Sequence, residues 1–209
     1  MSEPWRIGFV PGVTPDKWAR VWREREPGSP LELVPVGEED QRAVLDDHRV
    51  DMCLVRLPID TDGLHLIPLY VERAVVVAPR EHPVAAYDEV PLADLAHEQL
   101  VAGDVPGWEA LRTAEPLPFP ELTLPEALEV VASGTGIAIV PMSLARLHHR
   151  RDLVHRPVPD LPGTRIGLAW PAAREDERVE RFIGVVRGRT ARSSRGAPAP
   201  ATPRKGRRG

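Results

Sequence analysis

RIGFVPG (residues 6–12), LELVPV (31–36) and DMCLVRL (51–57) are the stretches that decide the fold of this chain. Each is a short, mainly apolar run followed by proline or glycine, which is typical of a strand that ends in a turn. A helix is predicted after the first stretch, where Thr14 has the character of an N-cap and Pro15 of a first helical residue. A second helix is expected over 38–47. Strand, helix, strand, helix, strand predicts a right-handed parallel α/β unit.

The remainder of the chain continues to mix strand-like and helix-like segments. Thr123 and Glu126 have the spacing of a capping box, which predicts that a helix begins there. The other expected elements are strands at 64–70, 73–78, 99–102, 137–140 and 165–170, an extended segment at 153–158, helices at 92–96, 141–149 and 175–188, and a loop at 103–122.

Charge is distributed unevenly along the chain. The 209 residues include 27 basic and 31 acidic residues, a net charge of −4. Seven basic residues and no acid lie after residue 188, which leaves 20 basic against 31 acidic residues, or −11, in 1–188. A body this acidic should repel a phosphate backbone, so we do not expect it to bind DNA. The tail 189–209 is expected to be disordered, with at most weak, non-specific contact with nucleic acid.

Several classes of chemistry find no support in the sequence. Cys53 is the only cysteine, which excludes an internal disulfide or a multi-cysteine metal site and favours the cytoplasm. No stretch approaches the roughly 20 apolar residues of a membrane span, and the N-terminus does not have the pattern of a secretory signal. Phosphate loops, dinucleotide fingerprints and nucleophile elbows are lacking too. No catalytic residue, cofactor, metal or membrane partner is therefore expected.

Three segments resemble signatures of the substrate-binding domain of LysR-type transcriptional regulators. VDMCLVR (50–56) is an aspartate-led strand after a helix. GLHLIPLY (63–70), continued by AVVVAP and EHPVA up to residue 85, is similar to the family's GLxxxPLxxExxxxVxPxxHPLA passage. VASGTGIAIVP (131–141) is similar to its VAAGxGIxxLP passage. The order and spacing of these segments carry the resemblance, which covers about residues 5 to 188.

The resemblance implies an α/β, two-lobed fold like that of periplasmic binding proteins (type 2), with a ligand cleft between the lobes. Lobe I would combine 4–74 with 163–188, and lobe II would be 75–162. It also implies a homodimer that joins first-lobe elements to the partner's second lobe. Because the first expected strand begins at Trp5, the chain is expected to lack the family's N-terminal winged helix-turn-helix, and DNA would be contacted only through such a separate or missing head.

Two candidate ligand residues follow strands of the first lobe. Thr14 lies after the first strand, where helix N-termini point amide groups at anions, and the matching family position offers a hydroxyl to a ligand carboxylate. A purely structural cap is the alternative. Arg56 ends an apolar strand, so its charge needs a partner. That partner is either a ligand carboxylate, bound in a bidentate manner, or an acid of the protein.

The second lobe offers three more candidates. Trp108, in the 103–122 loop, could stack on a ligand, or simply pack. Thr135 and Gly136 lie in the glycine turn 133–136, which is expected at the mouth of the second lobe. The same glycines could serve only to end the preceding helix.

Together these observations predict a cytoplasmic, non-enzymatic domain that senses a small molecule, an organic acid or a related metabolite, for a LysR-type regulator. A solute-binding protein for transport shares the fold but would need a signal or an anchor. A metabolic enzyme on the same fold would need a convergent set of acid, base or nucleophile, and we find none in the sequence.

Overall fold

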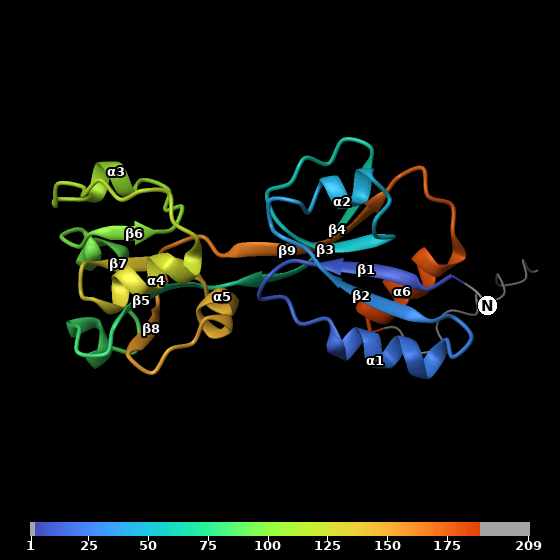
Figure 1. The fold of residues 1–209 in the computed structure, drawn as a ribbon, viewed down its shortest axis with the longest axis horizontal. Coiled ribbons are helices and arrows are strands. Elements are labelled where there is room, and N and C mark those ends of the chain that lie inside the picture. Colours follow the sequence, from blue (N-terminus) through green and yellow to red (C-terminus); the bar gives the residue numbers. More distant parts are fainter. Residues whose placement is uncertain (1–2, 189–209) are drawn as a thin grey trace, which may run out of the picture.

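In the computed structural model, the protein forms two lobes that lie side by side and are joined by two crossings of the chain (Figure 1). The structure describes residues 3–188, so the expected basic tail 189–209 lies outside the described residues. Each lobe is built on its own sheet, of five strands in the first lobe and four in the second. None of the helices within 3–188 is long and apolar enough to cross a membrane.

The first-lobe sheet confirms the parallel unit predicted from the opening of the chain. β1 runs parallel to β2 on one side and to β3 on the other. β9, which returns from the second lobe, runs antiparallel to both β3 and β4. In order across the sheet, the strands are β2 (Leu31–Pro35), β1 (Trp5–Phe9), β3 (Met52–Arg56), β9 (Thr164–Pro171) and β4 (Leu64–Glu72).

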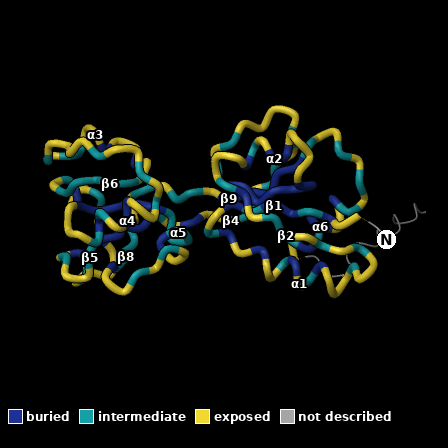
Figure 2. Tube along the Cα trace, viewed as in Figure 1, coloured by how far each residue is buried: buried dark blue, intermediate teal, exposed yellow. Residues whose placement is uncertain are grey.

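Helices cover both faces of this sheet, and β3 shows how the sequence sorts its side chains between them. Met52 and Leu54 pack into the core under α1 (Asp16–Arg25) and α6 (Glu177–Val186). Cys53 and Val55 point to the opposite face and pack with α2 (Ala43–Asp46). Successive strand side chains alternate between faces, so a strand buried on both faces reads as one continuous apolar run. The buried strands form the centre of each lobe (Figure 2).

The second lobe has the same layered construction. Its strands, in order across the sheet, are β6 (Leu100–Ala102), β7 (Ile137–Pro141), β5 (Ala74–Pro79) and β8 (Leu153–Pro157). One face packs against α4 (Leu124–Ala132) and α5 (Met142–Leu147). The other face packs against three short helices: the 3-10 helices η1 (Pro83–Ala86) and η2 (Leu92–Leu95), and α3 (Trp108–Leu111).

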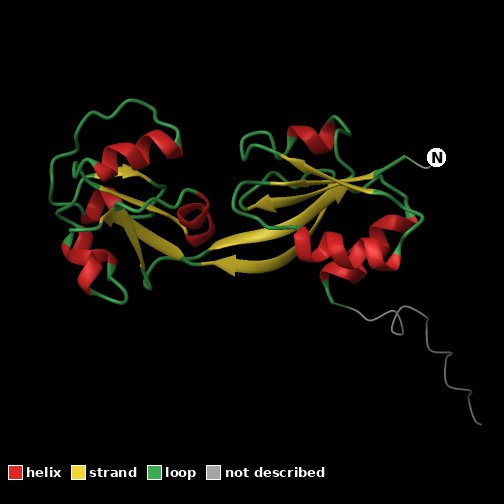
Figure 3. Ribbon diagram, turned by 60° about the horizontal axis from the view of Figure 1, so that its bottom comes forward, coloured by secondary structure: helices red, strands yellow, loops and turns green. Residues whose placement is uncertain are grey.

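The two crossings between the lobes lie close together (Figure 3). Arg73 separates β4 from β5, and its carbonyl oxygen accepts a hydrogen bond of 2.9 Å from the backbone N–H of Met142. On the returning crossing, a Cβ atom placed on Gly163 would lie 2.5 Å from the carbonyl oxygen of Glu72. Only glycine lets the returning segment pass the outgoing one at this distance.

Four local expectations were inaccurate. α1 begins one residue late, because Pro15 takes the N-cap position without a side-chain hydrogen bond, so Thr14 is not the cap. Much of the helix expected over 38–47 is a turn, and only Ala43–Asp46 is helical; in this turn the side-chain amide of Gln41 bonds the backbone of Arg56. The segment expected as a helix at 92–96 is the 3-10 helix η2, and the loop 103–122 contains α3.

Candidate functional site

A cavity of about 670 Å³ lies where the two lobes meet. Its first-lobe wall is the turn 11–14 after β1, together with the end of β2 at residues 35–37. Its second-lobe wall is α5, through Ser143, Arg146 and Leu147. β1 and β2 are parallel, so their carboxyl ends reach the same edge of the sheet, where ligands of open α/β sheets bind. The cavity is therefore a candidate ligand cleft built from both lobes.

Thr14 lines this cleft, as expected. Its side chain is exposed and does not cap α1, since Pro15 holds the N-cap position and the helix begins at Asp16. Within 3–188, its hydroxyl group has no hydrogen-bond partner, which leaves the hydroxyl able to donate to a molecule in the cleft. Its ligand role remains a proposal.

The two lobes approach closely beside Thr14. Gly12 has φ +85°, which favours glycine, and a Cβ atom there would lie 2.5 Å from Oγ of Ser143. The turn of the first lobe thus touches α5 of the second lobe with no room for a side chain. Leu144 also lies near this position.

Arg56 has protein partners on every donor group of its guanidinium. Nη1 lies 2.6 Å from Oε2 of Glu72, Nε lies 2.9 Å from Oε2 of Glu38, and Nη2 donates to the carbonyl oxygen of Pro11 at 2.9 Å. The side chain is only 5% exposed and does not line the cleft. From the sequence, the partner of Arg56 was either a ligand carboxylate or an acid of the protein, and in the structure it pairs with two protein acids, Glu38 and Glu72. Through Pro11, Arg56 supports the turn that lines the cleft.

Glu72 extends this buried network into the second lobe. The same Oε2 that pairs with Arg56 accepts a hydrogen bond of 2.8 Å from Oγ of Ser143 in α5. Glu72 is 7% exposed and stands at the end of β4, immediately before the crossing. One carboxylate oxygen therefore ties a first-lobe arginine to a cleft-lining residue of the second lobe.

The three second-lobe candidates do not reach the cleft. Trp108 is 6% exposed and belongs to the apolar core of that lobe, beside Ile137 and Ile139, so packing takes the place of stacking on a ligand. Thr135 is exposed and its hydroxyl is 2.9 Å from that of Ser133. Gly136 is buried where a Cβ atom would overlap the carbonyl oxygen of Gln99.

The position expected for the turn 133–136, at the mouth of the second lobe, is wrong. β7 runs antiparallel to β5, with Pro141 opposite Ala74 and Ala138 opposite Val77. Ala74 adjoins the crossing, so β7 ends there and begins at the far side of the sheet, where the turn lies. The direction of β7 is set by its antiparallel pairing with β5, and no local pattern in the sequence predicts that pairing.

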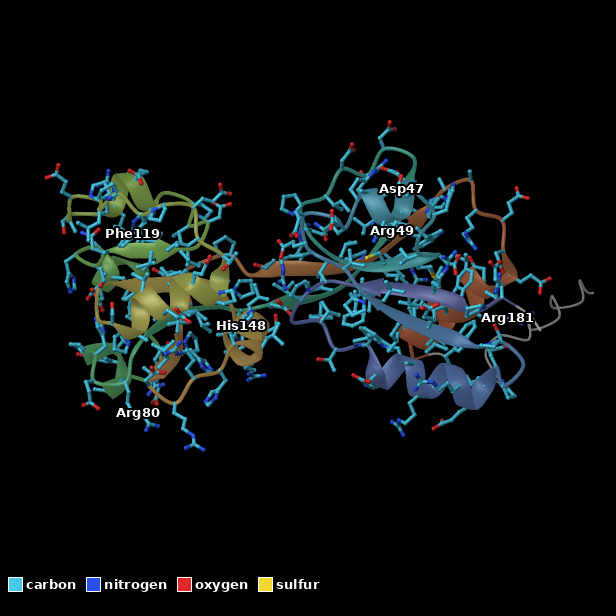
Figure 4. The ribbon with its side chains drawn as sticks, viewed as in Figure 1. Asp47, Arg49, Arg80, Phe119, His148 and Arg181 are labelled. Carbon is cyan, nitrogen blue, oxygen red and sulfur yellow. The ribbon has the colours of Figure 1, made fainter. Side chains whose placement is uncertain are left out.

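Arg146 is the cleft residue that sequence reasoning missed. It is the only charged side chain among those that line the cavity. Within 3–188, no carboxylate lies within ion-pair distance of its guanidinium. The pKa of His155 is lowered, first by burial and then by the positive charges of Arg146 and Arg156. The charge of Arg146 therefore acts on its neighbours in the second lobe. His148, directly after α5, lies on the side of the second lobe that faces the first (Figure 4).

Metal and thiol chemistry find little basis in the described residues. No group of three or more His, Cys, Asp or Glu side chains within 3–188 could hold a metal ion. Cys53 is fully buried in β3, and burial raises the pKa of its thiol to about 12. The thiol is therefore neutral and shielded at physiological pH.

Comparison with known proteins agrees with this architecture. The probable hydrogen peroxide-inducible genes activator of Mycobacterium avium is 30% identical over 198 residues, covering 87% of this chain and 63% of that protein. The Hca operon transcriptional activator HcaR of Escherichia coli K12 is 26% identical over 200 residues, covering 88% of this chain and 67% of that protein. The chain thus spans about two thirds of the length of these relatives.

Solved structures give the same result. The BenM effector binding domain with its effector benzoate has a TM-score of 0.69 and 25% identity, covering 93% of this chain and 95% of that one. The reduced form of OxyR has a TM-score of 0.70 and 25% identity, covering 90% and 95%. These likenesses confirm the α/β, type 2 periplasmic-binding-protein-like fold expected from the sequence. The family model described as the LysR substrate binding domain matches residues 2–191, and the chain belongs to that family.

Proposed function

We propose that this chain is the small-molecule sensing domain of a LysR-type transcriptional regulator and that its effector binds in the cleft between the lobes. The observation that carries the proposal is the cavity at the carboxyl ends of β1 and β2, closed on its other side by α5. A ligand that touches both walls can change the angle between the lobes. That angle is then a conformational signal that the rest of a regulator can detect.

A bound organic acid or related metabolite fits this domain better than direct reaction with peroxide. Two kinds of protein resemble it: activators named for hydrogen peroxide, and a domain solved with benzoate. Peroxide sensing by cysteine needs an accessible thiolate. Cys53 is the single cysteine of the chain and is buried, with a pKa of about 12. We therefore place this chain with the regulators that bind an effector.

The output that we propose is control of transcription, without catalysis. DNA would be contacted through a separate head domain, because residues 1–188 carry a net charge of −11, which repels a phosphate backbone. We propose that the regulator acts in the cytoplasm. We also propose a homodimer, as in other regulators of this type. Sedimentation that shows only monomer at high concentration would count against the dimer.

Native mass spectrometry of the protein purified from its own host tests the central proposal. A small molecule that co-purifies, and that stabilises the protein when added back, is the expected result. If no compound from a broad panel of acids, amines and neutral metabolites raises the melting temperature, the sensing role is contradicted. A substrate that is converted on incubation would favour the enzyme alternative.

A further inference from the structure

The side chains that line the cleft point to a particular class of effector. Its walls are mainly apolar, through Phe9, Val13, Val36 and Leu147 together with the prolines of the two first-lobe segments. No acidic side chain is among the lining residues. Such walls favour an apolar molecular body and give a polar or doubly charged body few hydrogen-bond partners.

Arg146 adds one positive charge to these apolar walls. Arg56, by contrast, is buried, bonds two carboxylates and a carbonyl oxygen of the protein, and does not line the cleft. Among residues 3–188, no carboxylate pairs with the guanidinium of Arg146, which can therefore donate two parallel hydrogen bonds to the carboxylate of a ligand.

The electrostatic surroundings of Arg146 support an anion at this place. The body of the protein has a net charge of −11, so a positive surface is a local exception. Near α5, however, positive groups lie close enough to repel one another. Burial is the larger cause of the lowered pKa of His155, and the charges of Arg146, Arg156 and His149 lower it further. An anion at Arg146 would relieve this repulsion.

Resting on the function proposed above, we propose that the effector is an apolar monocarboxylate, such as an aromatic or branched aliphatic acid, and that Arg146 binds its carboxylate. Thr14, on the opposite wall, donates its hydroxyl to the same carboxylate. The acid then bridges α5 and the turn 11–14. A dicarboxylate binds less well, because its second charge would enter an apolar cavity without a partner.

A panel of apolar monocarboxylates, each paired with its neutral primary amide, tests the class of effector. Benzoate with benzamide, and isovalerate with isovaleramide, are suitable pairs, and terephthalate serves as a dianion. Calorimetry and thermal shift are expected to show binding of at least one acid, at least tenfold weaker binding of its amide, and weaker binding of the dianion. If amides or dianions bind as well as their acids, the class is wrong although the sensing function stands. If no acid, amide or metabolite binds at all, the proposed function fails as well.

Arg146→Gln tests the assigned residue. Loss of a charge-assisted pair should weaken binding of the acid on the order of tenfold or more and leave the affinity of the amide unchanged. Arg151→Gln is the matched control, because Arg151 is also an exposed arginine near α5 but does not line the cleft. It should change the affinity for the acid less than twofold. Unchanged binding of the acid by Arg146→Gln, or an equal loss in both variants, would overturn the assignment.

Discussion

Removing the carboxylate of Glu72 should destabilise the protein more than any single surface substitution. Glu72 and Arg56 are 7% and 5% exposed, and their charged atoms are 2.6 Å apart. Loss of one partner from a buried ion pair typically costs about 3–5 kcal/mol, because the other charge stays buried. In Glu72→Ala, Glu38 remains 2.9 Å from Arg56 and still neutralises part of its charge. The expected cost therefore lies near the lower end of this range. The hydroxyl of Ser143 also loses its acceptor.

We therefore expect Glu72→Ala to lower the free energy of unfolding by about 3 kcal/mol. At about 2–4 °C per kcal/mol for a chain of this size, the melting temperature should fall by about 6–12 °C. Urea titration, followed by circular dichroism and tryptophan fluorescence, measures the loss as a lower midpoint at an unchanged slope.

Glu38→Ala is the matched control for Glu72→Ala. Glu38 pairs with the same arginine, but its side chain is 46% exposed, so its removal should cost less than about 1 kcal/mol. If Glu72→Ala costs no more than Glu38→Ala, the buried carboxylate does not hold the network together and the reasoning is refuted.

Other predictions concern the cleft, the thiol, the basic surface and the body of the protein. Thr14→Val should weaken binding of an acid in the cleft by about 1 kcal/mol in calorimetry, without a change in melting temperature, because one neutral hydroxyl is lost. Cys53 should react with a thiol reagent at pH 8 only after urea is added, and rapid reaction of the native protein would contradict its burial. The pKa of His155 lies below its ordinary value of 6.5, so the unfolded chain takes up that proton first and stability should fall as the pH drops through about 6.5. His155→Gln should flatten this part of the stability profile, and an unchanged profile would show that other groups cause it. In a gel shift at moderate salt, residues 1–188 should give no sequence-selective complex with duplex DNA.

The sequence was informative wherever local patterns decide the structure. Apolar runs and turn residues predicted the parallel arrangement of β2, β1 and β3. Thr123 and Glu126 form the expected capping box, in which both the backbone N–H and the hydroxyl of Thr123 donate to the glutamate. Such signals lie within a few residues of one another and need no tertiary contact.

The cleft could be predicted only in part, because it is assembled from distant segments. Thr14 was recognised from its place after the first strand, but Ser143 and Arg146 lie about 130 residues further on in a helix without a motif. The partners of Arg56 were ambiguous for the same reason: Glu38 and Glu72 come near it only when the turn after β2 and the end of β4 meet. The direction of β7, which removes Thr135 from the cleft, depends on pairing with a strand about 60 residues earlier.

The contact at Gly12 limits how the lobes can move. With only 2.5 Å between a would-be Cβ atom and Oγ of Ser143, the smallest added side chain would act as a wedge between them. Gly12→Ala would hold the two walls apart at a minimum gap set by one methyl group, and a larger residue would widen that gap. Position 12 is thus a natural stop for closure, where the size of one side chain sets the narrowest state the domain can adopt.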